Sequence, residues 1–467
     1  MKKTKIITSL GPSSYNPDVF EQMVLNGANV ARINFSHATL EEKQNDVAVV
    51  KEVTKRTGIH VGILYDTKGP EFRNGMLEND EITLVEGNTI RMVKENVLGN
   101  TERFSVNHPS AIDSLNVGNV ILLENGLMKI EVISKEEDGV TCKIVNGGIL
   151  GNRKSLSAPG VKLDIPFISE QDREDIIYAC RNDGDFLALS FVSCRDDVLQ
   201  AKEILKSENR TDLKIISKIE SMTGIENLEE IIEESDGIMV ARGDLGVEVP
   251  MTMLPIYQKQ IIKACREHGK ICVVATEMLE SMKKSPRPTR AEVSDVANAV
   301  LDGTDAVMLS GETTTGKFPA ETVKFMADIC ENAEQYYTNN FEFKEYIGTT
   351  ETIAESVVAS SKIKDVKAIV ASSVSGFSAR RISNLKPNCP ILATCTTDKT
   401  ARSLALNYGV SSTVVEEFDD TDKVLETAKN KAIEIFNLVS DDKIIITGSV
   451  PNTGEKRITN FMKIDEV

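Results

Sequence analysis

Short apolar runs rich in β-branched residues recur through roughly the first 310 residues, and nearly every run is followed by a segment of helical periodicity. Such alternation predicts parallel strands joined by helices. Eight strand–helix units close a (β/α)8 TIM barrel, so we predict an α/β fold built on one. The predicted strands are Lys5–Leu10, Ala28–Ile33, Gly62–Tyr65, Phe186–Phe191, Leu213–Ile219, Gly237–Ala241, Ile271–Ala275 and Ala306–Leu309.

One insertion interrupts this alternation after the third predicted strand. From Glu71 to about Ala158 the chain is rich in Thr, Val, Ile, Gly and Asn, and it shows no long helical pattern. Strand-like runs and turn signals alternate at regular spacing, which favours a small inserted β-rich unit over one long ordered loop. The clearest runs are Ile82–Val85, Thr89–Val93, Val120–Leu123 and Cys142–Val145.

A second α/β unit is predicted after about Phe341. Its strands Ala368–Ala371, Ile391–Thr394, Thr413–Val415 and Lys443–Ile446 alternate with helical segments, which indicates a separate open sheet. A chain of 467 residues is long enough for two or three cores. We therefore predict a barrel domain over 1–69 and 160–340, an inserted β-barrel lid over 70–159, and a C-terminal regulatory or oligomerisation domain over 341–467.

Charge and cysteine usage exclude several classes of protein. With 54 Lys and Arg against 71 Asp and Glu, the net charge is −17, which argues against nucleic-acid binding through bulk charge. The eight cysteines are scattered, with no CxxC pair, and are typical of reduced intracellular thiols. No secretory leader and no apolar run of 18 residues is found, so we expect a cytoplasmic protein without a membrane span.

Polar clusters follow the predicted barrel strands, at the end where such barrels carry their active sites. Taken alone, the charges after any one strand fit solvated strand ends about as well as a functional site. Six clusters in register favour a site. They are Arg32–His37, Asp66–Arg73, Lys218–Glu220, Arg242–Asp244, Thr276-Glu277 and Ser310–Glu312.

The stretch Ile215–Gly246 contains the most informative chemistry. Glu220 closes one strand and Asp244 follows the next, and two open carboxylates suit a hard divalent cation such as Mg²⁺. Lys218 lies beside them and is placed to stabilise developing negative charge.

Seven segments, read together, resemble the pyruvate kinase family in sequence and in order. They are KTKIITSLGPSS, ANVARINFSH, LYDTKGPEFR, IISKIE, DGIMVARGDLGVEVP, VVATEMLESM and SPRPTRAEVSDVANAVLDGTDAVMLSGET. The resemblance covers nearly the whole chain and implies transfer of a phosphoryl group from phosphoenolpyruvate to ADP, giving ATP and pyruvate. It also implies a barrel, a lid inserted after the third strand, a C-terminal α/β domain and a homotetramer.

The resemblance also implies the roles of individual residues. Glu220 and Asp244 would bind Mg²⁺ or Mn²⁺, and Lys218 would neutralise the phosphoryl group and the enolate. Arg32 would hold the phosphate. The substrate carboxylate would meet the amides of Gly243 and Asp244 and the hydroxyl of Thr276. The nucleotide-binding set would be Asn34, His37, Arg73 and Lys154.

A monovalent cation site is implied as well. Asn34, Ser36, Asp66 and Thr67 offer oxygens and one carboxylate, and their family counterparts bind K⁺. Glu71 stands where K⁺-dependent members carry Glu and K⁺-independent members carry Lys. We therefore predict K⁺ dependence.

The chain departs from the family pattern in its lid. The usual Asp-Asp-Gly turn is here Glu124-Asn125-Gly126, and the usual Asn-Leu-Pro-Gly hinge is Ser157-Ala158-Pro159-Gly160. The polar contacts that close the lid are therefore expected to differ.

The Ser-rich loop after the strand Ala368–Ala371 is a candidate effector site. A Ser-rich helix cap explains the loop about equally well. Val374 and Phe377 stand where activated members often carry basic side chains, so a monophosphorylated sugar or nucleotide effector, or none, is expected rather than a doubly phosphorylated sugar. The phosphate-binding residues would be Ser373, Ser375, Gly376 and Ser378.

Two rival functions are compatible with parts of this pattern. A metal-dependent mutase or aldolase would use Glu220, Asp244 and Arg32, but it would not need Lys154 in a lid or a K⁺ site. A catalytically silent regulator should have lost Lys218 or a metal carboxylate, and this chain keeps them.

Overall fold

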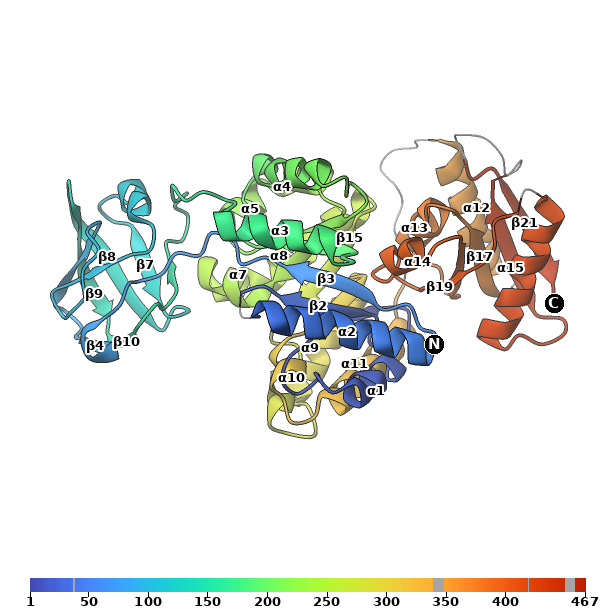
Figure 1. Cartoon of the computed structure of the whole chain (residues 1–467), viewed down its shortest axis with the longest axis horizontal. Helices are drawn as coiled ribbons and strands as arrows, with labels where there is room; N and C mark the ends of the chain where they lie inside the picture. Colours follow the sequence, from blue (N-terminus) through green and yellow to red (C-terminus); the bar gives the residue numbers. More distant parts are fainter. Residues whose placement is uncertain (37, 339–347, 364, 419, 450–457) are drawn as a thin grey trace.

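The structure is a computed structural model of the chain, and it describes all residues except 37, 339–347, 364, 419 and 450–457. Three bodies lie in a row in Figure 1. A β-rich unit lies at one end, a barrel lies in the middle, and an open α/β sheet lies at the other end. No described helix is both long enough and apolar enough to cross a membrane.

The central body is a closed barrel of eight parallel strands, in the order β1-β16-β15-β14-β13-β12-β3-β2. The predicted fold class is therefore confirmed, and each predicted strand overlaps an observed one. The strands are β1 (Lys5–Ser9), β2 (Val30–Asn34), β3 (Gly62–Asp66), β12 (Phe186–Leu189), β13 (Lys214–Ile219), β14 (Gly237–Ala241), β15 (Ile271–Ala275) and β16 (Ala306–Leu309).

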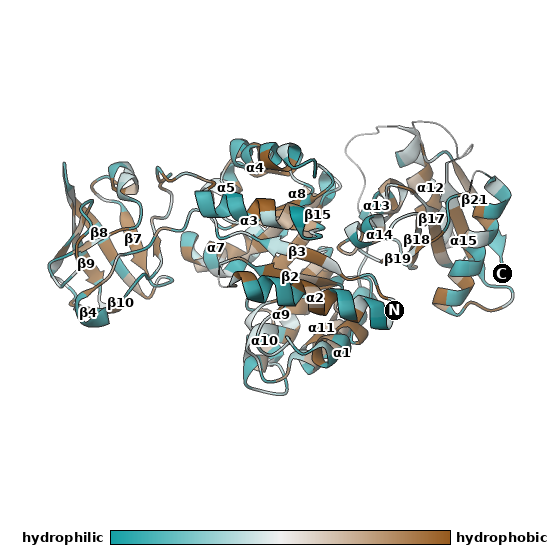
Figure 2. Cartoon of the chain, viewed as in Figure 1, coloured by the Kyte–Doolittle hydropathy of each residue, from teal (hydrophilic) through white to brown (hydrophobic). Residues whose placement is uncertain are grey.

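Alternating side chains of these strands supply two cores. Ile7 packs inside the barrel with residues such as Met239, whereas Ile6 packs outward against the helices. Figure 2 shows the apolar strands β2 and β3 behind helices with hydrophilic outer faces. The surrounding helices are α1 (Pro17–Leu25), α2 (Leu40–Thr57), α3 (Glu170–Arg181), α4 (Arg195–Ser207), α5 (Met222–Glu226), α6 (Leu228–Glu234), α7 (Arg242–Glu248), α8 (Leu254–Glu267), α9 (Arg290–Asp302), α10 (Gly311–Thr314) and α11 (Pro319–Glu334).

The inserted unit leaves the barrel after β3 and has a core of its own, which includes Phe104 and Ile121. It contains a sheet of order β11-β7-β8-β9-β5-β6 and a two-stranded ladder, β10-β4. The sequence indicated β4, β5, β7 and β9 but not the other strands. The bounds are β4 (Glu81–Leu84), β5 (Thr89–Val93), β6 (Arg103–Ser105), β7 (Val120–Leu123), β8 (Met128–Glu136), β9 (Gly139–Asn146), β10 (Gly148–Gly151) and β11 (Leu156–Ser157).

The C-terminal sheet has the order β19-β18-β17-β20-β21. Its first four strands are parallel, as the alternation predicted, and β21 pairs antiparallel with β20. The bounds are β17 (Val366–Ser372), β18 (Ile391–Cys395), β19 (Val410–Val414), β20 (Lys443–Gly448) and β21 (Phe461–Glu466), with α12 (Thr349–Ile363), α13 (Phe377–Asn384), α14 (Asp398–Ser403) and α15 (Thr421–Phe436).

The C-terminal body packs against the amino-terminal end of the barrel. Lys386 is fully buried there and lies 2.7 Å from Asp305, the residue that precedes β16. Lys5, the first residue of β1, donates a hydrogen bond to the carbonyl of Val410 at 2.6 Å. The carboxyl ends of the barrel strands, where the predicted site lies, are therefore at the opposite end.

Candidate active site

A buried network of alternating charges lies at the carboxyl ends of β2, β3 and β13. Arg32 Nε donates to Asp66 Oδ2 at 2.7 Å. Lys218 Nζ lies 3.1 Å from Asp66 Oδ1 and 3.1 Å from Glu220 Oε1. The barrel thus brings together four of the predicted residues, because the carboxyl ends of its parallel strands meet at one rim. The first and the last of them, Arg32 and Glu220, are more than 180 positions apart in the sequence.

The network holds Lys218 in its charged form. Burial alone would lower the pKa of Lys218, but the carboxylates of Asp66 and Glu220 outweigh burial and raise that pKa above its usual value. Burial alone would likewise raise the pKa of Asp66, but Lys218 and Arg32 lower it below its usual value. The site therefore keeps two fixed cations at its floor.

Glu220 and Asp244 behave differently from Asp66. Burial raises the pKa of Glu220 to about 7, against the opposing effect of Lys218. Burial also raises the pKa of Asp244, and the nearby carboxylates of Glu71 and Asp66 add to the rise. Two buried carboxylates in this state are short of positive charge, and a bound cation would supply it.

One carboxylate oxygen has room for a further ligand. Glu220 Oε2 accepts a hydrogen bond from the Phe191 amide at 2.6 Å, whereas the buried Oε1 accepts none despite its proximity to Lys218. Among the residues that the structure describes, no group of three or more His, Cys, Asp or Glu side chains is arranged to hold a metal ion. The residues present fit an open divalent site that a substrate would complete.

Gly243 and Thr276 meet at the ends of β14 and β15. The Gly243 amide donates to Thr276 Oγ1 at 2.7 Å, and Thr276 Oγ1 donates to the Ala275 carbonyl at 2.6 Å. The prediction placed the Gly243 amide and the Thr276 hydroxyl side by side as separate groups. In the structure they also bind each other.

The comparisons with known proteins agree with this geometry. A model of the pyruvate kinase barrel domain matches residues 1–323, and a model of the pyruvate kinase alpha/beta domain matches residues 351–465. The chain belongs to the pyruvate kinase family. It is 43% identical to the pyruvate kinase of Geobacillus stearothermophilus over 470 residues, which cover 99% of this chain and 80% of the relative.

Further relatives support the same assignment. A pyruvate kinase of Staphylococcus epidermidis is 43% identical over 471 residues, with 99% of this chain and 80% of the relative covered. A crystal structure of a pyruvate kinase from Cryptosporidium parvum superposes with a TM-score of 0.94 at 37% identity, and covers 100% of this chain and 96% of that chain. The pyruvate kinase family consists of kinase-type phosphotransferases, and its two domain models match the barrel and the C-terminal sheet of this chain.

Two cations predicted to bind nucleotide line the cleft between the lid and the barrel, which has a volume of about 420 Å³. Arg73 pairs with both carboxylate oxygens of Glu71, at 2.7 and 2.8 Å. Lys154 Nζ lies 2.6 Å from Glu124 Oε1. Both cations are therefore already paired with carboxylates, which the sequence did not indicate.

The predicted K⁺ residues are neighbours at the rim. Asn34 and Asp66 are register partners on β2 and β3. The Ser36 amide donates to Asn34 Oδ1 at 3.1 Å, and Thr67 follows Asp66 directly. His37, predicted for the nucleotide set, lies outside the described residues.

Two serines of the site were not predicted. Lys218 Nζ donates to Ser190 Oγ at 2.6 Å, and Arg32 Nη1 donates to Ser9 Oγ at 2.9 Å. Ser190 falls inside the predicted strand Phe186–Phe191, and Ser9 ends β1. Both serines lie inside the predicted strands, which extend past the observed ends of β1 and β12, so a search for polar residues after the strands did not include them.

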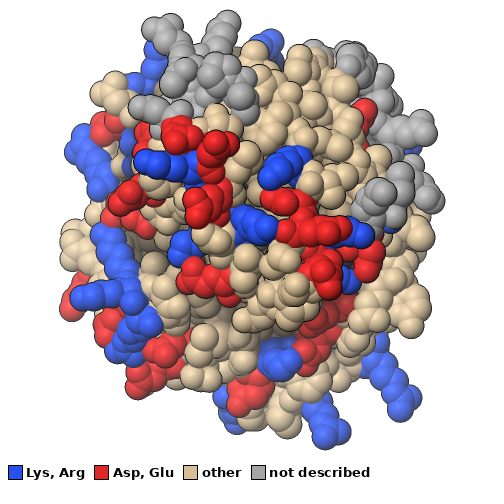
Figure 3. Space-filling view, turned by 90° about the vertical axis from the view of Figure 1, so that its right-hand side faces the viewer, with Lys and Arg blue, Asp and Glu red and all other residues tan. Residues whose placement is uncertain are grey.

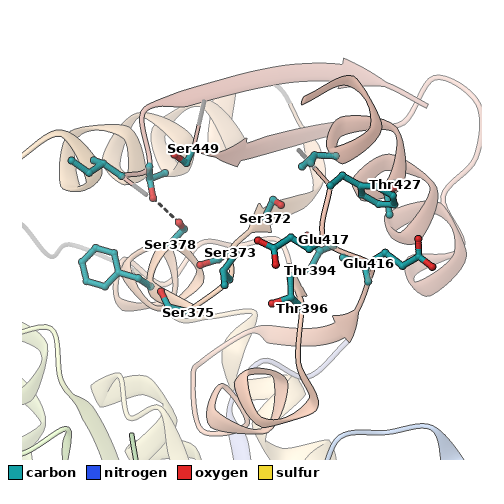
Figure 4. A pocket seen from close by; sticks show the side chains of 17 residues that line it. Ser372, Ser373, Ser375, Ser378, Thr394, Thr396, Glu416, Glu417, Thr427 and Ser449 are labelled. Carbon is teal, nitrogen blue, oxygen red and sulfur yellow. Dashed lines mark hydrogen bonds between the residues drawn. The ribbon is translucent and has the colours of Figure 1, made fainter. Parts of the chain in front are cut away.

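A second cavity, of about 470 Å³, lies at the carboxyl ends of the C-terminal strands. Figure 4 shows hydroxyls of Ser372, Ser373 and Ser375 along one side and the carboxylate of Glu417 directed toward them. Gly376 directly precedes α13 in a left-handed conformation, with φ of 74°, which glycine adopts without strain. Ser378 Oγ is hydrogen-bonded to Thr459 Oγ1 at 2.5 Å.

Proposed function

We propose that this chain transfers the phosphoryl group of phosphoenolpyruvate to ADP, giving ATP and an enolate that is protonated to pyruvate. The observation that carries the proposal is the buried Lys218, which is held charged between Asp66 and Glu220 beside Arg32. Phosphoryl transfer asks a protein mainly to position its substrates and to stabilise charge. A fixed pair of cations at the barrel rim does both.

Each cation has a distinct task in this account. The planar guanidinium of Arg32 pairs two phosphate oxygens, as an ammonium cannot. Lys218 presents a compact charge to the transferring group and to the enolate oxygen that remains. Because Asp66 contacts both cations, it fixes their spacing before the substrate arrives.

Glu220 and Asp244 would hold the divalent cation, Mg²⁺ or Mn²⁺. When bound, such an ion polarises the phosphoryl and carbonyl oxygens of the substrate as a Lewis acid. The support is the donor set itself, since both carboxylates have raised pKa values and Glu220 Oε1 accepts no hydrogen bond.

The remaining polar groups of the rim bind the rest of the two substrates. The amides of Gly243 and Asp244 and the hydroxyl of Thr276 would receive the carboxylate of phosphoenolpyruvate. To donate to it, the Thr276 hydroxyl would turn away from the Ala275 carbonyl, and the Gly243 amide would share its hydrogen between Thr276 Oγ1 and the carboxylate. Arg73 and Lys154 would exchange Glu71 and Glu124 for the phosphates of ADP, so the lid would close over the nucleotide as those pairs open. Asn34 and His37 complete the proposed nucleotide set.

K⁺ dependence is part of the proposal. Asn34, Ser36, Asp66 and Thr67 supply oxygens at adjacent strand ends, which suits a weakly held monovalent cation. Glu71 faces Lys68 at 3.5 Å and Arg73 at 2.7 Å, so its charge is retained at the edge of the site.

The C-terminal cavity is proposed as an effector site for a monophosphorylated sugar or nucleotide. Its support is the hydroxyl-rich loop with Ser373, Ser375, Gly376 and Ser378 at the start of α13. Ser378 would have to leave Thr459 to contact a phosphate. The family resemblance further supports a homotetramer, which sedimentation velocity would test.

The activity is tested by following phosphorus resonances while the chain is mixed with phosphoenolpyruvate, ADP, Mg²⁺ and K⁺. The proposal expects ATP and pyruvate to form in equal amounts. Consumption of phosphoenolpyruvate without ATP would instead favour a mutase or aldolase, and no reaction at all would favour a silent regulator.

A further inference from the structure

Thr276 has a backbone conformation that needs an explanation. It follows β15 with φ of 68°, and Glu277 after it has φ of 52°. The left-handed region is strained for a β-branched residue, and such residues persist where their surroundings hold them. Two consecutive left-handed residues that are not glycine, at the rim of the site, indicate that something constrains this turn.

Arg242 makes the contacts that constrain it. Its Nη2 donates to the Thr276 carbonyl at 2.7 Å and its Nε donates to the Ala275 carbonyl at 3.3 Å. The guanidinium thus binds the carbonyl of Ala275, which precedes the strained residue, and the carbonyl of Thr276 itself.

The guanidinium is itself fixed from the other side. Its Nη1 pairs with both carboxylate oxygens of Asp295 on α9, at 2.6 and 2.7 Å, and its side chain is only 10% exposed. Arg242 also begins α7 and immediately precedes Gly243 and Asp244. One side chain therefore joins the loop after β14 to the turn after β15.

We propose that Arg242 is a positioning residue, which holds the Thr276 turn in its left-handed conformation and thereby sets the Thr276 hydroxyl and the Gly243 amide at the substrate end of the site. The 2.7 Å hydrogen bond between that amide and that hydroxyl transmits the constraint between the two loops. The inference rests on the proposed function, because it assigns both groups to the carboxylate of phosphoenolpyruvate.

The first test is Arg242→Lys. The lysine keeps the charge beside Asp295, but one ammonium cannot hold Asp295 and two carbonyls at the same time. We expect kcat/KM for phosphoenolpyruvate to fall about 100-fold, because a small misplacement of binding groups can lower the rate by that factor. The KM for ADP should change less than about twofold.

Arg210→Lys is the matched control. Arg210 also donates to two main-chain carbonyls, those of Cys180 and Gly184, and pairs with Asp212 at 3.2 Å. It precedes β13 and so lies at the amino-terminal end of the barrel. Its replacement should leave kcat/KM within about twofold of the wild type. An equal loss in both variants would overturn the proposal.

A kinetic double-mutant cycle separates positioning from a general structural role. In a Thr276→Ala background the hydroxyl is gone. Adding Arg242→Lys to that background should therefore lower kcat/KM for phosphoenolpyruvate by less than about threefold. If the double variant lost kcat/KM by the full product of the two single losses, Arg242 would act independently of Thr276, and the proposal would fail.

A thermal cycle tests the same constraint without any activity. Glycine adopts the left-handed conformation freely. Arg242→Lys should therefore lower Tm by about 2 °C or more in the wild type but by less than half as much in Thr276→Gly. Equal losses in both backgrounds would overturn the proposal. If the wild type forms no pyruvate, the proposed function fails, and this cycle alone decides the role of Arg242.

Discussion

The chain has two polar cavities at the carboxyl ends of parallel strands, and they differ in how they handle charge. In the barrel, Lys218 and Asp66 are buried and contact each other directly. In the C-terminal sheet, the cavity is lined mainly by hydroxyls and apolar side chains, with Glu416 and Glu417 as the charged residues among its described lining. The same strand-end geometry thus serves a site of paired opposite charges and a cavity whose described lining has two carboxylates and no lysine or arginine.

The difference follows from what surrounds each rim. The strand ends of the closed barrel form a ring, so Arg32 on β2 meets Asp66 on the neighbouring β3, and Lys218 on β13 reaches Asp66 past β12. The attraction between opposite charges offsets the cost of burying each of them. The open sheet offers ends from one side only. Figure 3 shows the outer end of the C-terminal body, where basic and acidic side chains are both present on the surface.

The largest expected effect is in the charged site. Glu220→Gln should lower kcat by about 10²–10³-fold and weaken Mg²⁺, because it removes a carboxylate from the charge-stabilising network. Steady-state kinetics at varied Mg²⁺ would measure both. Glu334→Gln is the control, since Glu334 is also buried but accepts from the amides of Lys3 and Thr4 at the other end of the barrel. Similar losses in both variants would count against a divalent site at Glu220.

The proposed monovalent cation separates the two cavities further, because its oxygens at Asn34, Ser36, Asp66 and Thr67 belong to the barrel rim. We expect activity to fall about tenfold or more when Na⁺ replaces K⁺, a difference worth about 1.4 kcal/mol of barrier. Glu71→Lys should remove most of this dependence, because its ammonium would stand in for the ion. Equal rates of the wild type in both salts would refute the K⁺ assignment.

The C-terminal cavity can be made more like the charged site. Val374→Lys with Phe377→Arg should raise the affinity for a doubly phosphorylated sugar by about tenfold or more, since each added cation pairs with a phosphate. Titration calorimetry on the wild type and the double variant would measure it. Tighter binding of a doubly phosphorylated than of a monophosphorylated sugar by the wild type would contradict the proposed effector class.

The last effect concerns stability rather than activity, at a buried carboxylate that lies outside both cavities. Asp46 on α2 is 2% exposed, its Oδ1 accepts no hydrogen bond, and burial raises its pKa to about 7. The folded state binds the Asp46 proton more tightly than the unfolded state does. The contribution of this proton to the free energy of unfolding is therefore full below about pH 4 and is lost as the pH rises through 7.

Asp46→Asn should therefore unfold like the wild type near pH 4. It should be more stable above pH 7, by up to about 4 kcal/mol if the whole shift is realised. Urea unfolding at the two pH values would show the difference. A stability gain that does not depend on pH would contradict the assignment.

The sequence predicted the barrel well because its signal is local. Each β-branched run between helical segments identifies a strand, and eight such units leave one way to close. Strand β8 was missed although Met128, Ile130 and Val132 alternate with charged residues within its nine residues. Strand β21 was missed because it is an edge strand with alternating charges, and β6, β10 and β11 because such short runs show little pattern. Their pairing depends on the rest of the sheet.

The site divides in a similar way. Lys218, Glu220 and Asp244 were selected as candidates from their chemistry at predicted strand ends, whereas the roles of Arg32 and Asp66 were implied by the family resemblance. The pairs Arg73 with Glu71 and Lys154 with Glu124 depend on how the lid folds back on itself. The left-handed turn at Thr276 is set by contacts from Arg242 and has no signature of its own in the sequence.

The most direct test of the account is the rate of pyruvate formation by Lys218→Met beside Lys43→Met. Both lysines are buried and paired with an aspartate, Lys218 with Asp66 in the site and Lys43 with Asp175 between helices at 2.8 Å. We predict that Lys43→Met keeps a kcat within about threefold of the wild type and that Lys218→Met loses at least about 10³-fold. A Lys218→Met variant that kept most of its activity would contradict the claim that this charged rim carries out phosphoryl transfer.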